Sequence, residues 1–184
     1  MSGELGCIDV PSLKWEQPKW TQRLHRLVCG ETVYATMEWP QAFRSTAVSN
    51  SREGRYTFKR GGFLHPFITV RRQEFEMDHA KLSLDWKGNG ELVFTNAQRF
   101  TFTRDGLARF DYQVTDHRGD RLFSLKKEMS AIKHSGEVHI TPAGMNNREI
   151  ALLVTLAWYL AVMVTEDAAT ASSAAVASGC TSGS

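Results

Sequence analysis

Two pairs of cations could bind an anionic group. Lys59-Arg60 and Arg71-Arg72 are separated by a short stretch that begins with two glycines. Lysine and arginine hold phosphate oxygens through charge-assisted hydrogen bonds, and a short glycine-containing connection would bring the two pairs close together. If a phosphorylated ligand or an anionic lipid headgroup binds, we expect Lys59, Arg60, Arg71 and Arg72 to contribute most. The alternative is that they belong to the solvated face and protected edges of a sheet.

Strand geometry limits how many of these cations can converge, because successive side chains point to opposite faces. Tyr56 and Phe58 mark the inner face of one strand, which puts Lys59 outside. Arg60 ends that strand and is expected to turn outward. Lys59 with one of the two later arginines is then the expected pair on one outer face.

The other reactive side chains show no catalytic or metal-binding pattern. The six histidines are scattered, and Cys7, Cys29 and Cys180 form no CxxC pair and have no histidine at ligand spacing. The sequence contains no GxSxG elbow, phosphate loop or dinucleotide fingerprint. We therefore expect no enzymatic activity, no cofactor, no metal and free thiols in a reducing compartment.

Composition is that of a soluble globular chain. Its 184 residues include 42% hydrophobic and 23% charged residues, and the formal net charge is +2. This length suffices for one substantial core without disulfides, and the near balance of charge gives no argument for a nucleic-acid partner. The first residues lack the basic and apolar regions of a secretory signal. The expectation is a cytoplasmic monomer that can associate peripherally with a membrane.

Apolar residues recur with a period of two over most of the chain. Val33, Ala35 and Met37 alternate with polar neighbours, and the sequence KGNG joins two alternating runs as a hairpin around residues 87–90. Roughly ten such strands, with turns every 8 to 12 residues, indicate an antiparallel sandwich or barrel.

The run over residues 150–164 is apolar on every side, which is typical of a helix buried on all faces. Asn146 is its expected N-cap, with Glu149 completing a capping box. The run spans roughly 22 Å, less than the roughly 30 Å of a bilayer core. A helix threaded through the barrel is therefore expected, and a membrane tail anchor formed by residues 150–164 is the alternative.

The predicted fold is mainly β: a closed antiparallel barrel of about 10–12 strands wrapped around one buried C-terminal hydrophobic helix. Residues 1–22 are expected to form a loop-like extension, in which Trp15, Trp20 or both pack on the body. Residues 23–168 would form the barrel domain, with the central helix at about 147–166. Residues 169–184, rich in Ala, Ser, Thr and Gly, are expected to form a flexible tail.

Several segments resemble the tubby C-terminal-like superfamily, which includes the LURP-one-related proteins and the phospholipid scramblases. They are WKGNGELVF (86–94), FTF (100–102), DHRGDRLF (116–123), NREIALLV (147–154) and WYL (158–160). The last two are similar to the central helix of bacterial members. The resemblance implies a twelve-stranded barrel wound around its C-terminal helix. It also implies a relation to lipids, since tubby domains bind phosphoinositide headgroups through basic residues on adjacent strands and scramblases associate with membranes.

Two kinds of function follow as expectations. The first is a non-enzymatic binding module for an anionic lipid headgroup or phosphorylated ligand at a membrane surface. The second is a structural or protein-interaction barrel without a lipid ligand, whose loops and tail contact a protein partner. The family resemblance favours the first, whereas the near-neutral charge counts against it.

Overall fold

The structure of the protein, a computed structural model, describes residues 8–40, 45–62, 65–74, 77–106, 110–128 and 133–178, with side chains up to residue 169. It contains twelve strands and two helices. In chain order these are β1 (Ser12–Glu16), β2 (Leu24–Cys29), β3 (Thr32–Glu38), β4 (Thr46–Ser51), β5 (Gly54–Gly61), β6 (Phe67–Arg72), β7 (Asp78–Leu84), β8 (Gly90–Phe94), β9 (Arg99–Asp105), β10 (Asp111–Asp116), β11 (Arg121–Glu128), β12 (Ser135–Ile140), α1 (Pro142–Met145) and α2 (Ile150–Ser178).

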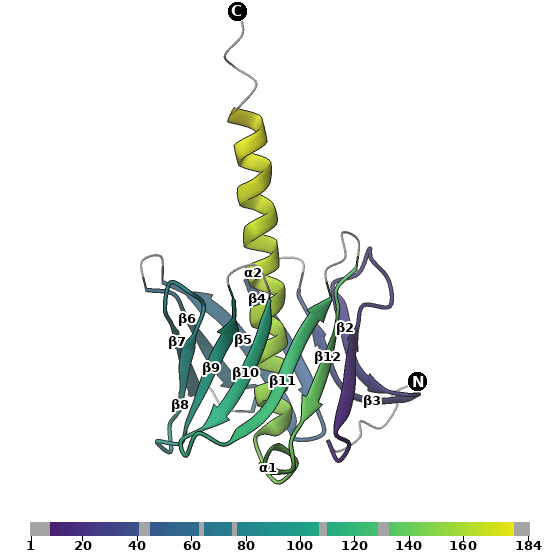
Figure 1. Cartoon of the computed structure of the whole chain (residues 1–184), viewed down its shortest axis with the longest axis vertical. Coiled ribbons are helices and arrows are strands. Elements are labelled where there is room, and N and C mark those ends of the chain that lie inside the picture. Colours follow the sequence, from purple (N-terminus) through teal and green to yellow (C-terminus); the bar gives the residue numbers. More distant parts are fainter. Residues whose placement is uncertain are drawn as a thin grey trace, which may run out of the picture.

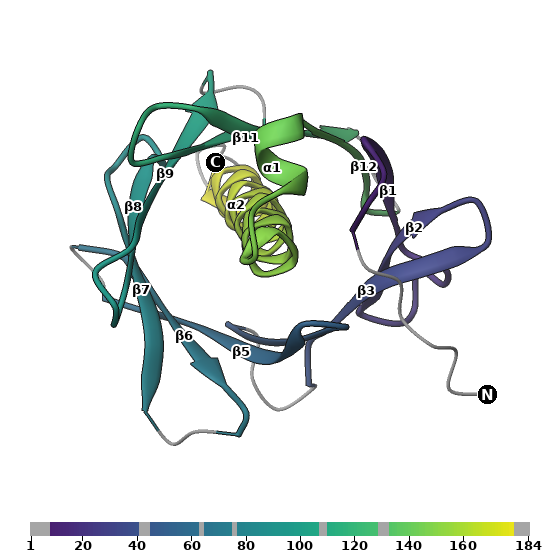
Figure 2. The ribbon, with the colours of Figure 1, turned by 90° about the horizontal axis from the view of Figure 1, so that it is seen from below.

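The strands form one closed barrel, in which each strand pairs antiparallel with its neighbours in sequence. The ring closes where β1 pairs with β12, with Leu13 opposite Val138. Alternate side chains point inward, as on β9, where Phe100 and Phe102 are buried between exposed neighbours. Figure 2 shows the ring of strands with α2 inside it. The predicted closed antiparallel barrel around a C-terminal helix is confirmed.

The central helix fills the barrel with apolar side chains. Every residue from Ile150 to Met163 is buried, because strands surround this part of α2 on all sides. The polar exception is Thr155, whose hydroxyl donates to the Leu152 carbonyl 2.9 Å away and so stays satisfied. Within the described residues, one helical stretch (Ile150–Ala169) is long and apolar enough to cross a membrane, and 78% of its most apolar window is buried. The run named as a possible tail anchor is thus covered by strands in this structure.

The N-terminal segment contributes to the barrel, contrary to the expected loop over residues 1–22. It contains β1, which closes the ring. Trp15 on this strand is fully buried and stacks on Trp158 of α2, with ring centroids 5.2 Å apart. Trp20, in the following loop, is 67% exposed. Proline and sparse alternation had concealed a short strand.

The start and end of the central helix also differ from the prediction. Asn146 caps the C-terminus of the short helix α1, which the sequence did not indicate, and Thr141 caps the N-terminus of α1. The Asn147 side chain accepts from the Glu149 amide at 2.9 Å, just before α2 begins at Ile150. At its other end α2 continues to Ser178, well beyond the predicted end near residue 166. Alanine, which forms helices readily, dominates this extension.

The two ends of the barrel are distinct because the strands alternate in direction. Connections that follow odd-numbered strands lie at one end, and those that follow even-numbered strands lie at the other. We call the first the exit end, because α2 leaves the barrel there and projects beyond the rim (Figure 1). The second is the α1 end, where α1 turns the chain from β12 into the barrel.

Candidate functional site

The register of β5 and β6 separates the two predicted pairs of cations. Lys59 and Arg60 lie where β5 reaches the exit end, whereas Arg71 and Arg72 lie where β6 reaches the α1 end. The connection between these strands is short, but the strands run antiparallel, so Lys59 and Arg60 lie opposite Thr69 and Ile68 at the start of β6 and not opposite Arg71 and Arg72. The four side chains therefore do not converge on one site.

The two members of each pair also point to opposite faces of the sheet. Lys59 and Arg71 both point outward and are diagonal neighbours, since Lys59 lies opposite Thr69 in the ladder. Arg60 and Arg72 have the opposite parity and point toward the inside of the barrel at opposite ends. The predicted outer-face pair thus exists as Lys59 with Arg71, and Arg71 there also bonds Asp78 at 2.5 Å.

Arg60 turns inward, contrary to the expectation that it would turn outward. Its Nη1 donates a hydrogen bond to Oδ2 of Asp167 on α2, at 2.5 Å. Arg23, just before β2, holds the adjacent Glu166 in the same way at 2.5 Å, and its guanidinium lies 5.3 Å from the ring centroid of Trp39. Two arginines from non-neighbouring parts of the wall therefore hold α2 where it leaves the barrel.

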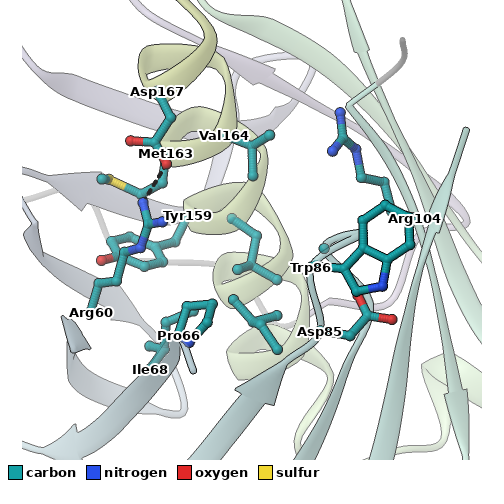
Figure 3. Close-up of a pocket in the computed structure, with 13 residues that line it drawn as sticks. Arg60, Pro66, Ile68, Asp85, Trp86, Arg104, Tyr159, Met163, Val164 and Asp167 are labelled. Atoms are coloured by element: carbon teal, nitrogen blue, oxygen red, sulfur yellow. Dashed lines mark hydrogen bonds and ion pairs between the residues drawn. The ribbon is translucent and has the colours of Figure 1, made fainter. Parts of the chain in front are cut away.

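A pocket of about 210 Å³ opens at the exit end, between α2 and the wall formed by β5 to β9. Its apolar lining comes from both sides: the wall gives Pro66, Ile68 and Leu84, and the helix gives residues that include Leu160 and Met163. Figure 3 shows Pro66, Ile68 and Met163 around the pocket, with Arg60 on one side and Arg104 on the other.

The polar groups beside this pocket are fixed by local bonds. The Asp85 carboxylate accepts from the backbone amides of Lys87 and Asn89, both at 2.8 Å, and from the Asn89 side chain at 2.9 Å. Desolvation raises the pKa of Asp85, but these hydrogen bonds outweigh it and the pKa is lowered, so the carboxylate is ionised at neutral pH. The Arg104 guanidinium lies 5.1 Å from the centroid of the Phe110 ring.

Tyr159 forms part of the pocket floor and is held in its protonated form. Its hydroxyl donates to the Ser45 carbonyl at 2.5 Å. Burial raises its pKa well above the usual value, so this phenol does not act as a base near neutral pH. With apolar walls and engaged polar groups, the pocket is suited to binding an apolar group.

The rim of the exit end carries exposed aromatic side chains. Of the five tryptophans, Trp20 and Trp86 are 67% and 81% exposed, and both lie in exit-end connections. Trp86 also borders the pocket, and the Lys87 ammonium lies 5.0 Å from its ring centroid. A second hollow at this end, of about 470 Å³, is bordered by residues from Thr21 to Leu24 together with Glu38 and Trp39.

The two ends differ in charge. Among the described residues, the exit-end connections contain four cations and one carboxylate: Lys19, Arg23, Lys87 and Lys133 against Asp85. The segments at the α1 end contain three cations and six carboxylates: Arg52, Arg118 and Arg148 against Asp9, Glu31, Glu53, Glu74, Asp120 and Glu149. Where α2 leaves the barrel, Glu166 and Asp167 add two carboxylates and Arg60 adds one cation. The end that bears the exposed tryptophans thus keeps a small excess of cations, whereas the α1 end has an excess of carboxylates.

Beneath the exit end, the structure brings together two histidines that looked unrelated in sequence. The rings of His25 and His134 stack with centroids 5.5 Å apart, and Trp158 Nε1 donates to His25 Nδ1 at 2.8 Å. Desolvation, reinforced by the charges of Lys127 and Arg23, lowers the pKa of His25 to about 3 and that of His134 to about 4. Both are neutral at physiological pH.

Sequence reasoning missed both features of the exit end. The histidine pair joins β2 to a residue just before β12, and no local spacing reveals such a contact. Trp20 and Trp86 can be placed at the same end of the barrel only when the strands are counted correctly, because both then lie in connections after odd-numbered strands. Six strands, β2 to β7, separate the two tryptophans, and β2 was not among the strands expected from the sequence; with five strands between them they would lie at opposite ends.

The exit end thus combines an apolar pocket, a rim with two exposed tryptophans and an excess of cations. Within the described part of the chain, no three histidine, cysteine or acidic side chains come together as metal ligands would. No protein-family model, curated protein or solved structure matches this chain.

Proposed function

We propose that this protein is a non-enzymatic binding module whose exit end docks on a membrane surface containing anionic phospholipid. The observation that carries the proposal is that Trp20 and Trp86 are highly exposed and share one end of the barrel, which is also the positive end. Tryptophan favours the interface between membrane and water, where its ring is partly desolvated while its N–H stays hydrated.

Charge supports the same orientation. An anionic leaflet attracts each nearby lysine or arginine by about 1 kcal/mol, and salt screens this attraction. Lys19 and Lys87 flank the two tryptophans in sequence and are exposed. The excess of carboxylates at the α1 end repels the same surface, so the opposite orientation is disfavoured. The protein is proposed to work as a cytoplasmic, peripherally bound monomer.

As part of this proposal we relate the chain to the tubby C-terminal-like superfamily. A barrel wound around its C-terminal helix is the arrangement that the sequence resemblance implies, and it supports the relation. Arg71 and Arg72 lie at the α1 end, so in the proposed orientation they face away from the bilayer. Lys59 and Arg71 therefore do not act as a pair in the proposed contact.

Co-sedimentation with vesicles tests the proposal. The double variant Trp20→Ser, Trp86→Ser should bind vesicles of phosphatidylcholine and phosphatidylserine at least tenfold more weakly than the parent. Met77→Ser is the matched control, because Met77 is 78% exposed but lies at the α1 end. Equal binding by the parent and the double variant, or equal loss in Met77→Ser, would reject the exit end as the docking surface.

A further inference from the structure

The exit pocket is lined on both sides by apolar side chains. Ile68 is buried on β6, and Leu160 and Met163 are buried on α2, so both walls are hydrocarbon. Leu84 and Val164 are partly buried and lead from the core toward the opening. The pocket thus continues the apolar core outward to the rim, between the helix and the strands (Figure 3).

The size of the pocket fits one hydrocarbon chain. An apolar cavity of about 150 Å³ accommodates benzene, so the 210 Å³ here holds roughly eight carbon atoms. A volume of this size corresponds to part of one acyl chain, and the rest of a longer chain would extend through the opening. Ring systems much larger than this would require the wall to move away from α2.

The mouth offers cations to a negatively charged head. Arg60 and Arg104 lie on either side of the opening, and Lys87 lies beside Trp86. A guanidinium has five N–H donors, so Arg60 can keep its bond to Asp167 while donating to a second anion. Asp85 is engaged within its own turn, so it does not aim a bare carboxylate at the ligand.

We propose that this pocket takes one acyl chain of an anionic membrane lipid, with the head held at the mouth by Arg60 and Arg104. The inference rests on the proposed docking of the exit end, because docking would put the mouth at the level of the lipid headgroups. One chain would leave the bilayer and enter the protein, while the head remains at the interface. The pocket would then anchor the protein to an individual lipid, in addition to the general attraction of the rim.

Soluble chains test the pocket without a membrane. Calorimetric titration of the full chain with butanoate, hexanoate, octanoate and decanoate should show affinity rising about fourfold per methylene. The rise should stop near octanoate, where the pocket is full. Octanol should bind more weakly than octanoate, because it lacks the anionic head. Affinity that is independent of chain length, or octanol binding as tight as octanoate, would overturn the assignment.

Val164→Phe should fill the pocket and weaken octanoate binding at least tenfold. Val10→Phe is its matched control, because Val10 is likewise partly buried against the core but precedes β1 at the α1 end. Leu84→Phe fills the same pocket from the wall and serves if the helix variant does not fold. If a folded Val164→Phe or Leu84→Phe variant binds octanoate as tightly as the parent does, octanoate does not bind in this pocket.

The proposed docking and the proposed pocket fail in different ways. Lys19→Gln with Trp20→Ser changes the rim outside the pocket, so it should weaken vesicle binding but leave octanoate binding unchanged. Val164→Phe should weaken octanoate binding at least tenfold while retaining the attraction of the rim for vesicles. If the parent protein binds octanoate but does not bind vesicles, the pocket is supported and the docking is rejected. The reverse result, vesicle binding with no chain binding, would reject the pocket alone.

Discussion

Trp158 Nε1 donates a hydrogen bond to His25 Nδ1 across 2.8 Å, which links the central helix to β2 within the core. Trp15 stacks on Trp158 and is equally buried, but its own Nε1 has no hydrogen-bond partner among the described residues. Trp158→Phe should lower the free energy of unfolding more than Trp15→Phe, by about 1–3 kcal/mol, because it leaves the His25 acceptor unpaired. Urea denaturation of the two variants measures the difference. Equal losses would show that the hydrogen bond contributes nothing beyond packing.

Acid should destabilise the barrel through the histidine pair. His25 and His134 have pKa values of about 3 and about 4 in the folded chain, against roughly 6.5 when unfolded. The unfolded chain therefore binds more protons as pH falls below about 6.5, and stability declines by up to about 1.4 kcal/mol per pH unit for each histidine. His134→Gln should flatten this decline between pH 6.5 and 4.5, measured by denaturant unfolding. His139→Gln is the control, because His139 is exposed; the same flattening there would contradict the prediction.

Glu53 should act in the opposite sense. Desolvation raises its pKa to about 7, assisted by Glu149 and opposed by the hydrogen bond from the Ala151 amide at the start of α2. The unfolded chain releases the Glu53 proton near pH 4.5, whereas the folded chain holds it up to about pH 7. The free energy of unfolding therefore falls as the pH rises from 4.5 to about 7. Glu53→Gln should gain stability relative to the parent from pH 5 to pH 8. If the difference in free energy of unfolding between Glu53→Gln and the parent stays constant from pH 5 to pH 8, the raised pKa of Glu53 is contradicted.

A charge in the middle of α2 should prevent folding. Leu153 is fully buried among strands, and an unpaired carboxylate there would lack both water and a partner. Leu153→Asp should lose the cooperative unfolding transition in circular dichroism. Ala168→Asp is the control on the same helix, since Ala168 is exposed beyond the rim. A Leu153→Asp protein that melts like the parent would show that this helix is not the core.

Removing charge at one end should weaken attachment to membranes, whereas removing it at the other should not. Lys19→Gln with Lys87→Gln takes two exposed cations from the exit end and should cost about 2 kcal/mol, roughly thirtyfold in affinity, at low salt. Arg52→Gln with Arg118→Gln removes the same charge from the α1 end. Co-sedimentation with phosphatidylserine vesicles at two salt concentrations compares them. A similar loss in both variants would point to net charge rather than to a docking face.

The fold was predictable because two periodicities dominate this sequence. Alternation of period two reports one buried and one solvated face, as on β9 and β10, and an apolar run without a polar face requires burial on every side. Together they permit few architectures. β1 escaped detection because it is short, and its buried Leu13 and Trp15 lie among prolines and charges.

The candidate site was less predictable because it depends on register and on contacts between distant residues. Lys59 and Arg72 are close in sequence, yet antiparallel pairing puts them at opposite ends of the barrel. His25 and His134 are far apart in sequence, yet the closure of the ring makes them neighbours. If β2 is left out of the strand count, the segment that contains Trp20 is assigned to the wrong end of the barrel. Local spacing contains none of this information.

The order of the elements along the chain has a consequence for biosynthesis. The ring closes only when β12 meets β1, and the helix that fills it follows β12. During translation the wall is therefore made first, and its inward phenylalanines and leucines remain without their packing partner until about residue 163 has left the ribosome. Contacts between the two ends of a chain form slowly. The nascent protein thus passes through a stage with an unfilled apolar interior, and this stage is where a chaperone that binds hydrophobic strands would act.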